Sequence, residues 1–220
     1  MRCLVTAGPT FEPLDAVRRL TNFSTGRLGS ELAGFLAGRG HEVTLFLGQQ
    51  ATWRGSCPAQ HVESFTTTAD LRERLLRQTA QPPQAIFHAA AVSDFAFGKI
   101  WRRMDDGRLE EVRSGKFSTR QGDLLAELTP TPKLLAEFRD WFPSAQIIGW
   151  KYEVDGDRAR AIELAREQIV RCRVNACVVN GPAYGVGFGL LSANGAVSHF
   201  ADPSALFTAL ERFVRPAGTM

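Results

Sequence analysis

The stretch Thr21 to Gly29 reads T-N-F-S-T-G-R-L-G and brings two glycines, small hydroxyl side chains and an amide into one short segment. It follows an apolar run at residues 3–7, typical of a strand, and precedes an amphipathic helix pattern over residues 28–38. A junction from strand to helix offers free backbone N–H groups and the positive end of a helix dipole. Because both favour a bound anion, we expect this segment to bind phosphate.

The glycine spacing in this segment matches neither the dinucleotide fingerprint G-x-G-x-x-G nor the P-loop pattern. A simpler interpretation is a turn in which Ser24 or Thr25 caps the following helix. Spacing alone leaves both interpretations open.

Strand and helix patterns alternate along the rest of the chain. Alternation of this kind requires crossover connections, which produce a mainly parallel sheet covered on both faces. The sequence therefore predicts a doubly wound, Rossmann-like α/β fold in a single domain over residues 1–220. The expected strands are 41–47, 85–91, 146–152 and 174–179, and the expected helices are 69–79, 132–142 and 158–171.

Two further features complete the predicted fold. Asn194-Gly195 favours a tight turn, so residues 188–191 and 197–200 should form a β-hairpin, followed by a helix over 204–214. The apolar hairpin residues serve either the core or an interface. Residues 105–121 are polar and lack periodicity, which indicates a mobile flap loop.

Composition excludes several classes of protein. The 220 residues are 44% hydrophobic and 22% charged, which is ordinary for a globular chain, and the net charge of +3 is too small to indicate a nucleic-acid surface. No apolar run approaches the length of a membrane span, so we expect a cytoplasmic protein without membrane contact. The four cysteines lack metal-ligand or redox spacing, which argues against zinc and disulfides.

Ligands of open parallel sheets bind outside the carboxyl ends of the strands. The segments that follow the predicted strands are residues 8–10, 90–94, 150–153 and 180–182. We expect all of them to face one cleft, together with the glycine-containing segment.

Six pieces of sequence, in order, carry a resemblance. They are T-A-G-P-T at 6–10, V-R-R-L-T-N-F-S-T-G-R-L-G at 17–29, H-A-A-A-V-S-D-F at 88–95, K-F-S-T at 116–119, T-P-K-L-L at 131–135 and V-V-N at 178–180. Together they resemble the phosphopantothenoylcysteine synthetase (phosphopantothenate-cysteine ligase) family, in a stand-alone form without the flavin-dependent decarboxylase domain.

The resemblance implies a ligase of coenzyme A biosynthesis that joins 4′-phosphopantothenate to L-cysteine. The intermediate would be an acyl nucleotidylate formed from CTP or ATP with Mg²⁺, whose ligands the sequence does not identify. No FMN is expected. Family members are commonly homodimers in which a flap of one subunit helps to close the site of the other.

The same resemblance implies roles for individual residues. Asn22 would hold phosphopantothenate and its acyl intermediate, and Ala90 and Ala91 would let the substrate approach the backbone. Lys116 would be the catalytic lysine, with Lys99 as its rival. For each, a structural role in a turn, a strand or the solvated surface is the alternative.

Nucleotide binding would involve residues from four segments. Trp150 stands where the family usually has phenylalanine, and its alternative role is core packing. For the other residues of the set, the alternative role is to shape a turn or to cap a helix. The implied nucleotide-binding set is Gly8, Ser24, Gly26, Gly29, Asp94, Trp150 and Asn180.

Two other functions remain open at this level. One is a nucleotide-binding module without catalysis. The other is an NAD(P)-dependent oxidoreductase, although the chain lacks G-x-G-x-x-G after its first strand and a Tyr-x-x-x-Lys pair.

Overall fold

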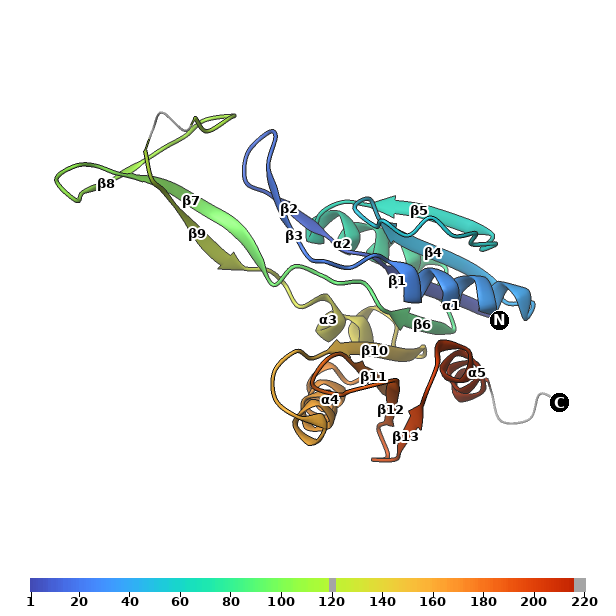
Figure 1. Ribbon diagram of the computed structural model, residues 1–220. Coiled ribbons are helices and arrows are strands. Elements are labelled where there is room, and N and C mark those ends of the chain that lie inside the picture. The colour runs from blue at the N-terminus through green and yellow to red at the C-terminus, as the bar shows by residue number, and fades with distance from the viewer. Residues whose placement is uncertain (119–121, 216–220) are drawn as a thin grey trace.

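An eight-stranded sheet forms the centre of the molecule, in the order β13-β12-β11-β10-β6-β1-β4-β5 (Figure 1). The computed structural model describes residues 1–118 and 122–215. The parallel strands are β1 (Arg2–Ala7), β4 (Glu42–Gly48), β5 (His61–Phe65), β6 (Ala85–His88), β10 (Gln146–Tyr152) and β11 (Ala176–Asn180). The predicted doubly wound, mainly parallel sheet is confirmed.

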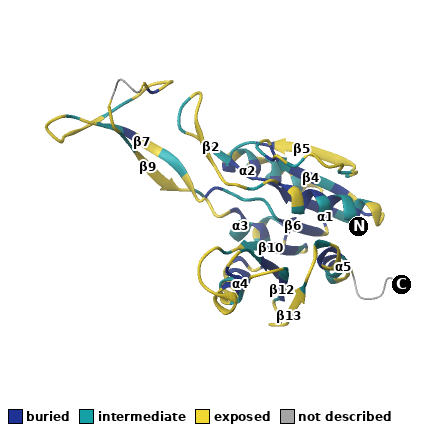
Figure 2. Ribbon diagram, in the orientation of Figure 1, coloured by how far each residue is buried: buried dark blue, intermediate teal, exposed yellow. Residues whose placement is uncertain are grey.

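Helices cover both faces of this sheet (Figures 1 and 2). One buried cluster contains Leu71, Phe138 and Ala161 from three helices, and the other contains Leu32 and Leu206 from two. The first face carries α2 (Thr68–Arg77), the short helix η1 (Gln78–Ala80), α3 (Leu134–Trp141) and α4 (Arg158–Cys172), and the second carries α1 (Arg27–Gly38) and α5 (Pro203–Val214).

The order of the strands reverses between β1 and β6. From β1 the chain first adds β4 and β5 on one side, and then returns to add β6, β10 and β11 on the other. Crevices at such a reversal are where open α/β sheets bind ligands. The glycine-containing turn, at the start of α1, lies at this point.

The C-terminal hairpin is confirmed. β12 (Phe188–Ser192) and β13 (Val197–Phe200) pair antiparallel across the predicted turn, where Gly195 has φ +89°. Phe188 and Phe200 are half-buried against the second core cluster. The hairpin therefore extends the main sheet and packs on the core.

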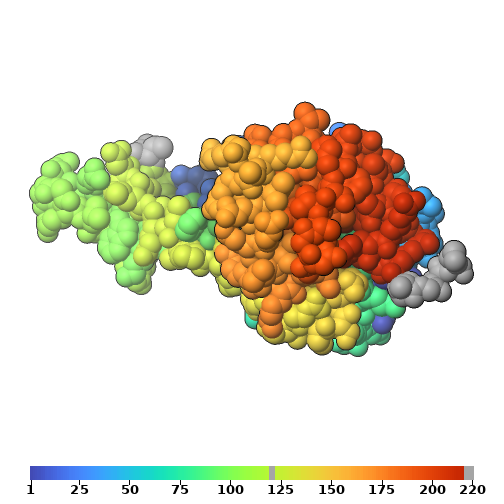
Figure 3. Space-filling model, turned by 90° about the horizontal axis from the view of Figure 1, so that it is seen from below, coloured from blue at the N-terminus to red at the C-terminus, as the bar shows by residue number. Residues whose placement is uncertain are grey.

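A three-stranded antiparallel sheet projects from the body, and two of its strands flank the expected irregular flap (Figures 1 and 3). It consists of β7 (Phe95–Arg103), β8 (Leu109–Glu111) and β9 (Leu124–Pro130), and we call residues 95–118 and 122–130 the arm. The expectation of a structureless segment over 105–121 was wrong where β8 forms. Thr119, the last residue of the K-F-S-T piece, lies outside the described residues.

Three other strands were also missed. β2 (Phe11–Pro13) and β3 (Arg19–Thr21) form a small hairpin before the glycine-containing turn, and β5 lies at the edge of the main sheet. Across the described part of the chain, no helix combines the length and apolar character that a membrane span needs.

Candidate active site

A cleft of about 880 Å³ lies outside the carboxyl ends of β6, β10 and β11 and against the start of α1. Segments far apart in the sequence meet there, as the strand-end argument predicts. Of the residues singled out from the sequence, all but Gly8 and the two candidate lysines line it: Asn22, Ser24, Gly26, Gly29, Ala90, Ala91, Asp94, Trp150 and Asn180.

The start of α1 has no side-chain cap. Gly26 is the N-cap residue, with φ +78°, a backbone conformation that glycine adopts without strain. Thr25 Oγ1 accepts a hydrogen bond from the Arg27 backbone N–H at 3.3 Å, and Ser24 does not cap the helix. Apart from the Arg27 N–H, the first turn therefore presents N–H groups without side-chain partners beside the cleft, as anion binding requires.

Close packing brings α1 against β1. A Cβ added at Gly29 would lie 2.6 Å from Ala7 Cβ, so a side chain at Gly29 would push the helix away from the strand. Gly8 lies beneath the turn, because its Cα is 3.4 Å from the position that a Cβ of Gly26 would occupy. In this geometry Gly8 supports the turn and does not line the cleft.

Asn22 links the turn to the segment that follows β6. Its Nδ2 donates a hydrogen bond to the Ala91 carbonyl oxygen at 3.1 Å. Within the described chain, its Oδ1 accepts no hydrogen bond from protein. The amide therefore fixes one side of the cleft while it keeps an acceptor for a ligand.

The chain has four lysines, and the two that line the cleft are not those chosen from the sequence. Lys133 forms an ion pair with Asp94, and Lys151 Nζ lies 2.8 Å from Glu153 Oε1. Lys151 lies in the strand-end segment 150–153 that the sequence placed at this edge, whereas Lys133 lies outside those segments.

Lys116 and Lys99 lie on the arm. Lys99 Nζ is 3.6 Å from Glu111 Oε2, whereas Lys116 has no ion pair among the described residues. The loop of Lys116 is held against the β2–β3 turn: the backbone N–H of Phe117 donates to Asp15 Oδ2 at 3.2 Å, and that of Ala16 donates to the Gly115 carbonyl at 3.0 Å. Neither lysine lines the cleft of its own chain.

Trp150 and Asn180 hold unpaired polar atoms in the cleft wall. Trp150 pairs with Val178 and Tyr152 pairs with Asn180 in the parallel register of β10 and β11, so Trp150 and Asn180 point to the same face of the sheet. Trp150 Nε1 and Asn180 Oδ1 are buried and lack hydrogen-bond partners within the described part of the chain. Such orphaned groups are costly, and because both atoms are buried a ligand would satisfy them only if the cleft wall shifts to expose them.

His88 is a cleft residue that sequence reasoning missed as a functional group. It ends β6 and is buried, with Nδ1 2.8 Å from Thr6 Oγ1. Burial lowers the pKa of the imidazole to about 4, so the ring is neutral at pH 7. Its place directly before A-A-A at a strand end was the available signal.

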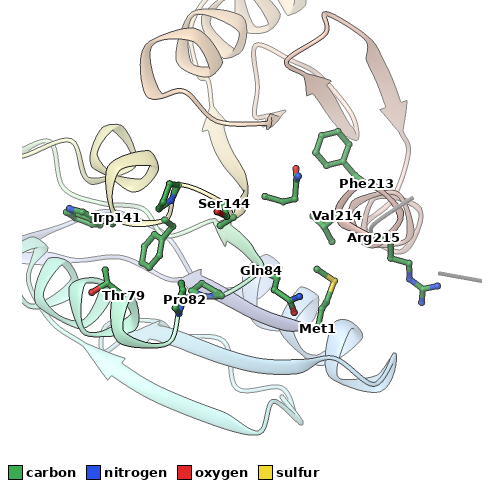
Figure 4. A pocket seen from close by; sticks show the side chains of 14 residues that line it. Met1, Thr79, Pro82, Gln84, Trp141, Ser144, Phe213, Val214 and Arg215 are labelled. Carbon is green, nitrogen blue, oxygen red and sulfur yellow. The ribbon is translucent and has the colours of Figure 1, made fainter. Parts of the chain in front are cut away.

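A second pocket, of about 790 Å³, lies at the opposite edge of the sheet (Figure 4). Met1, Gln84 and Gln146, at the amino ends of β1, β6 and β10, line it together with Trp141 and Phe213. None of the predicted site residues lines it. The chemistry therefore points to the first cleft.

The described residues contain no group of three or more His, Cys, Asp or Glu side chains arranged to hold a metal ion.

Residues 1–202 match the model of the family described as DNA/pantothenate metabolism flavoprotein C-terminal domain. The chain belongs to this family. The match covers the cleft, the main sheet and the arm. Every predicted site residue therefore lies within the family region.

Two relatives of the family domain are informative. The coenzyme A biosynthesis bifunctional protein CoaBC of Thermococcus kodakarensis is 31% identical over 179 residues, which is 81% of this chain and 41% of the relative. The phosphopantothenate–cysteine ligase of Homo sapiens is 32% identical, covering 76% of this chain and 70% of the relative. The chain thus spans less than half of the bifunctional relative and most of the human one.

The fold of the family domain is also found in a solved structure. The DNA/pantothenate metabolism flavoprotein from Streptococcus pneumoniae superposes with a TM-score of 0.81, at 23% identity, over 96% of this chain and 97% of that one. At this identity the likeness establishes the fold alone.

Proposed function

We propose that the chain is a phosphopantothenate–cysteine ligase. The observation that carries the proposal is the convergence of Asn22, the uncapped start of α1, Ala90–Ala91 and Asp94 on one cleft. The names of the bifunctional CoaBC relative and of the human ligase support the same activity. The substrates would be 4′-phosphopantothenate, L-cysteine and either CTP or ATP.

In the first step, a carboxylate oxygen of 4′-phosphopantothenate attacks the α-phosphorus of the nucleotide. The new bond joins that oxygen to phosphorus, and the bond from phosphorus to the bridging oxygen of the β-phosphate breaks, so pyrophosphate leaves. The product is an acyl nucleotidylate. In the second step, the cysteine amine attacks the acyl carbon, loses a proton and expels the nucleoside monophosphate.

Neither step requires a nucleophile from the protein. Catalysis then depends on holding the reacting atoms together and on stabilising the charge that develops at phosphorus and at the acyl oxygen. The uncapped N–H groups of the first turn of α1 bind a phosphoryl group, and Asn22 orients the acyl group through its free Oδ1.

Mg²⁺ is proposed to enter with the nucleotide. Phosphate oxygens and water are the ligands it prefers, and the described residues offer no acidic cluster of their own. When bound, it neutralises charge on the triphosphate and favours departure of pyrophosphate.

The catalytic lysine is proposed to be Lys116, acting in a homodimer. Its ammonium has no ion pair in the described chain, and it lies on a projecting arm outside its own cleft (Figure 3). The arm also exposes Phe95, Leu109 and Leu128, whose relative exposures are 44%, 50% and 49%. An arm that covers the cleft of a second copy would bury these side chains and deliver the lysine.

Substrate-dependent release of pyrophosphate tests the proposal. With 4′-phosphopantothenate, cysteine and Mg²⁺, we expect release with CTP or ATP, and a loss of at least about a hundredfold in Asn22→Asp, because a carboxylate there repels anionic substrates and loses the donor to Ala91. Asn194→Asp, at the distant hairpin turn, is the matched control and should retain activity. Nucleotide binding without any pyrophosphate release would instead support a module without catalysis.

A further inference from the structure

His88 occupies a distinctive position in the wall of the cleft. In the sheet register it stands between Thr6 of β1 and Gly149 of β10, at the carboxyl end of β6. The ring packs edge-on against Phe138 of α3, with centroids 4.8 Å apart. Only 6% of the residue is exposed, yet it lines the cleft. The imidazole is therefore fixed in place, with one edge at the ligand cavity.

Hydrogen bonding determines which ring nitrogen carries the proton. Thr6 Oγ1 accepts the backbone N–H of Ala90 at 3.3 Å and lies 2.8 Å from His88 Nδ1. Among the described residues, His88 Nδ1 is the only acceptor within reach of the Thr6 hydroxyl hydrogen. If Nδ1 carried the proton, the buried hydroxyl hydrogen would have no acceptor, which is costly. The Thr6 hydroxyl has an acceptor only when it donates to Nδ1 and the ring proton is on Nε2.

The Nε2–H is left without a protein partner in the described part of the chain. Nε2 keeps some accessible surface, because neither nitrogen of His88 is among the fully buried side-chain atoms that lack partners. The donor therefore reaches the cleft. Burial keeps the ring neutral at pH 7 by lowering its pKa to about 4.

We propose that His88 is a specificity and positioning donor, whose neutral Nε2–H hydrogen-bonds an anionic oxygen of a substrate in the cleft. The inference rests on the proposed function for the identity of the ligands. Both phosphoryl and carboxylate oxygens have this chemistry, so either the nucleotide or 4′-phosphopantothenate supplies the oxygen. A neutral donor stabilises the oxygen without competing to protonate it.

Imidazole ¹⁵N spectra of histidine-labelled protein test the tautomer directly. The chain has four histidines, and His88→Gln assigns the signal of interest. We expect a pyrrole-type resonance for Nε2 and a pyridine-type resonance for Nδ1, unchanged from pH 8 to pH 6. A proton on Nδ1, or titration of the ring in that range, would overturn the inference.

Addition of ligand identifies the oxygen. CTP, ATP and 4′-phosphopantothenate are added separately, each with Mg²⁺, and one of them should shift the Nε2 resonance of His88 while exposed His61 stays unchanged. A shift with a nucleotide assigns a phosphoryl oxygen. A shift with 4′-phosphopantothenate alone assigns either its phosphate or its carboxylate. Addition of pantothenate, which lacks the phosphate, distinguishes these two groups. Saturation by all three ligands without a shift would refute a hydrogen bond.

Substitutions separate the donor from simple packing. Thr6→Val removes the hydroxyl and should move the proton of His88 toward Nδ1, with about a tenfold rise in KM for the ligand that His88 contacts, whereas Thr6→Ser should preserve both properties. His88→Leu should raise the same KM, and His88→Gln, which keeps an N–H donor, should recover part of the loss. Equal KM values in Thr6→Val and Thr6→Ser would contradict the role.

The inference and the proposed function can fail separately. Turnover by the wild-type protein without any ligand-induced shift at His88 would refute the inference and leave the ligase intact. A shift with a nucleotide in a protein that releases no pyrophosphate would refute the ligase and retain the donor.

Discussion

At the scale of single residues, His88 also makes stability depend on pH. Its pKa in the folded protein is about 4, below the ordinary 6.5, because burial disfavours the charged ring. The unfolded chain therefore binds the proton more readily, and folding stability falls as the pH drops from 6.5 toward 4. Between pH 7.5 and pH 5, urea unfolding should lose roughly 1–2 kcal/mol more in the wild type than in His88→Gln. Equal losses of unfolding free energy in the two proteins would show that protonation of His88 does not destabilise the folded state.

Substitution of Trp150 should weaken nucleotide binding while it leaves stability nearly unchanged. Trp150→Phe keeps an aromatic ring and removes the Nε1–H that lacks a protein partner. We expect unfolding stability within about 1 kcal/mol of the wild type, and nucleotide affinity about tenfold weaker by calorimetry. Trp141→Phe, in the wall of the pocket at the opposite edge, is the matched control. Unchanged affinity in Trp150→Phe would remove this N–H from nucleotide recognition.

At the scale of elements, the contact of α1 with β1 can be tested with two glycines of one helix. Gly29→Ala would bring its Cβ to 2.6 Å from Ala7 Cβ, so the helix start must shift. We expect a loss of roughly 1–3 kcal/mol in thermal unfolding and weaker nucleotide binding. Gly38→Ala, with no atom within 4 Å of its Cβ, should gain roughly 0.5–1 kcal/mol. Similar stability changes in both variants would contradict the packing.

Elements with one buried face were predictable from apolar patterns, whereas the mostly exposed β13 was predictable only from the Asn194-Gly195 turn. β10 and α4 were located from apolar patterns because their inward residues pack in a core. β5 is exposed at four of its five positions, and β9 is exposed over most of its length, so neither has the alternation that identifies a strand. The cleft was predictable from strand ends, whereas Lys133 and His88 required the three-dimensional register.

At the scale of the whole molecule, the proposed homodimer predicts complementation between two inactive variants. Asn22→Asp replaces the amide that the cleft requires, and Lys116→Gln removes the ammonium group from the arm. If each arm serves the partner's cleft, a mixed dimer regains one intact site, and random pairing should restore about one quarter of wild-type activity.

The controls for complementation are simple. Each variant alone should stay inactive after the same unfolding and refolding, and light scattering should report a dimer. A dimeric mixture without recovered activity would contradict action of Lys116 on the partner's cleft. A monomeric mass for the active wild type would contradict the homodimer.

If one cleft joins the two substrates through an acyl nucleotidylate, an oxygen of the phosphopantothenate carboxylate must pass to the nucleoside monophosphate, and isotope labelling follows this transfer. 4′-Phosphopantothenate with ¹⁸O in its carboxylate is converted with cysteine, Mg²⁺ and CTP or ATP, and the products are analysed by mass spectrometry. Attack on the α-phosphorus predicts one ¹⁸O in the nucleoside monophosphate and the other in the new amide. Label in inorganic phosphate, or amide formation without label in the nucleoside monophosphate, would exclude an acyl nucleotidylate intermediate.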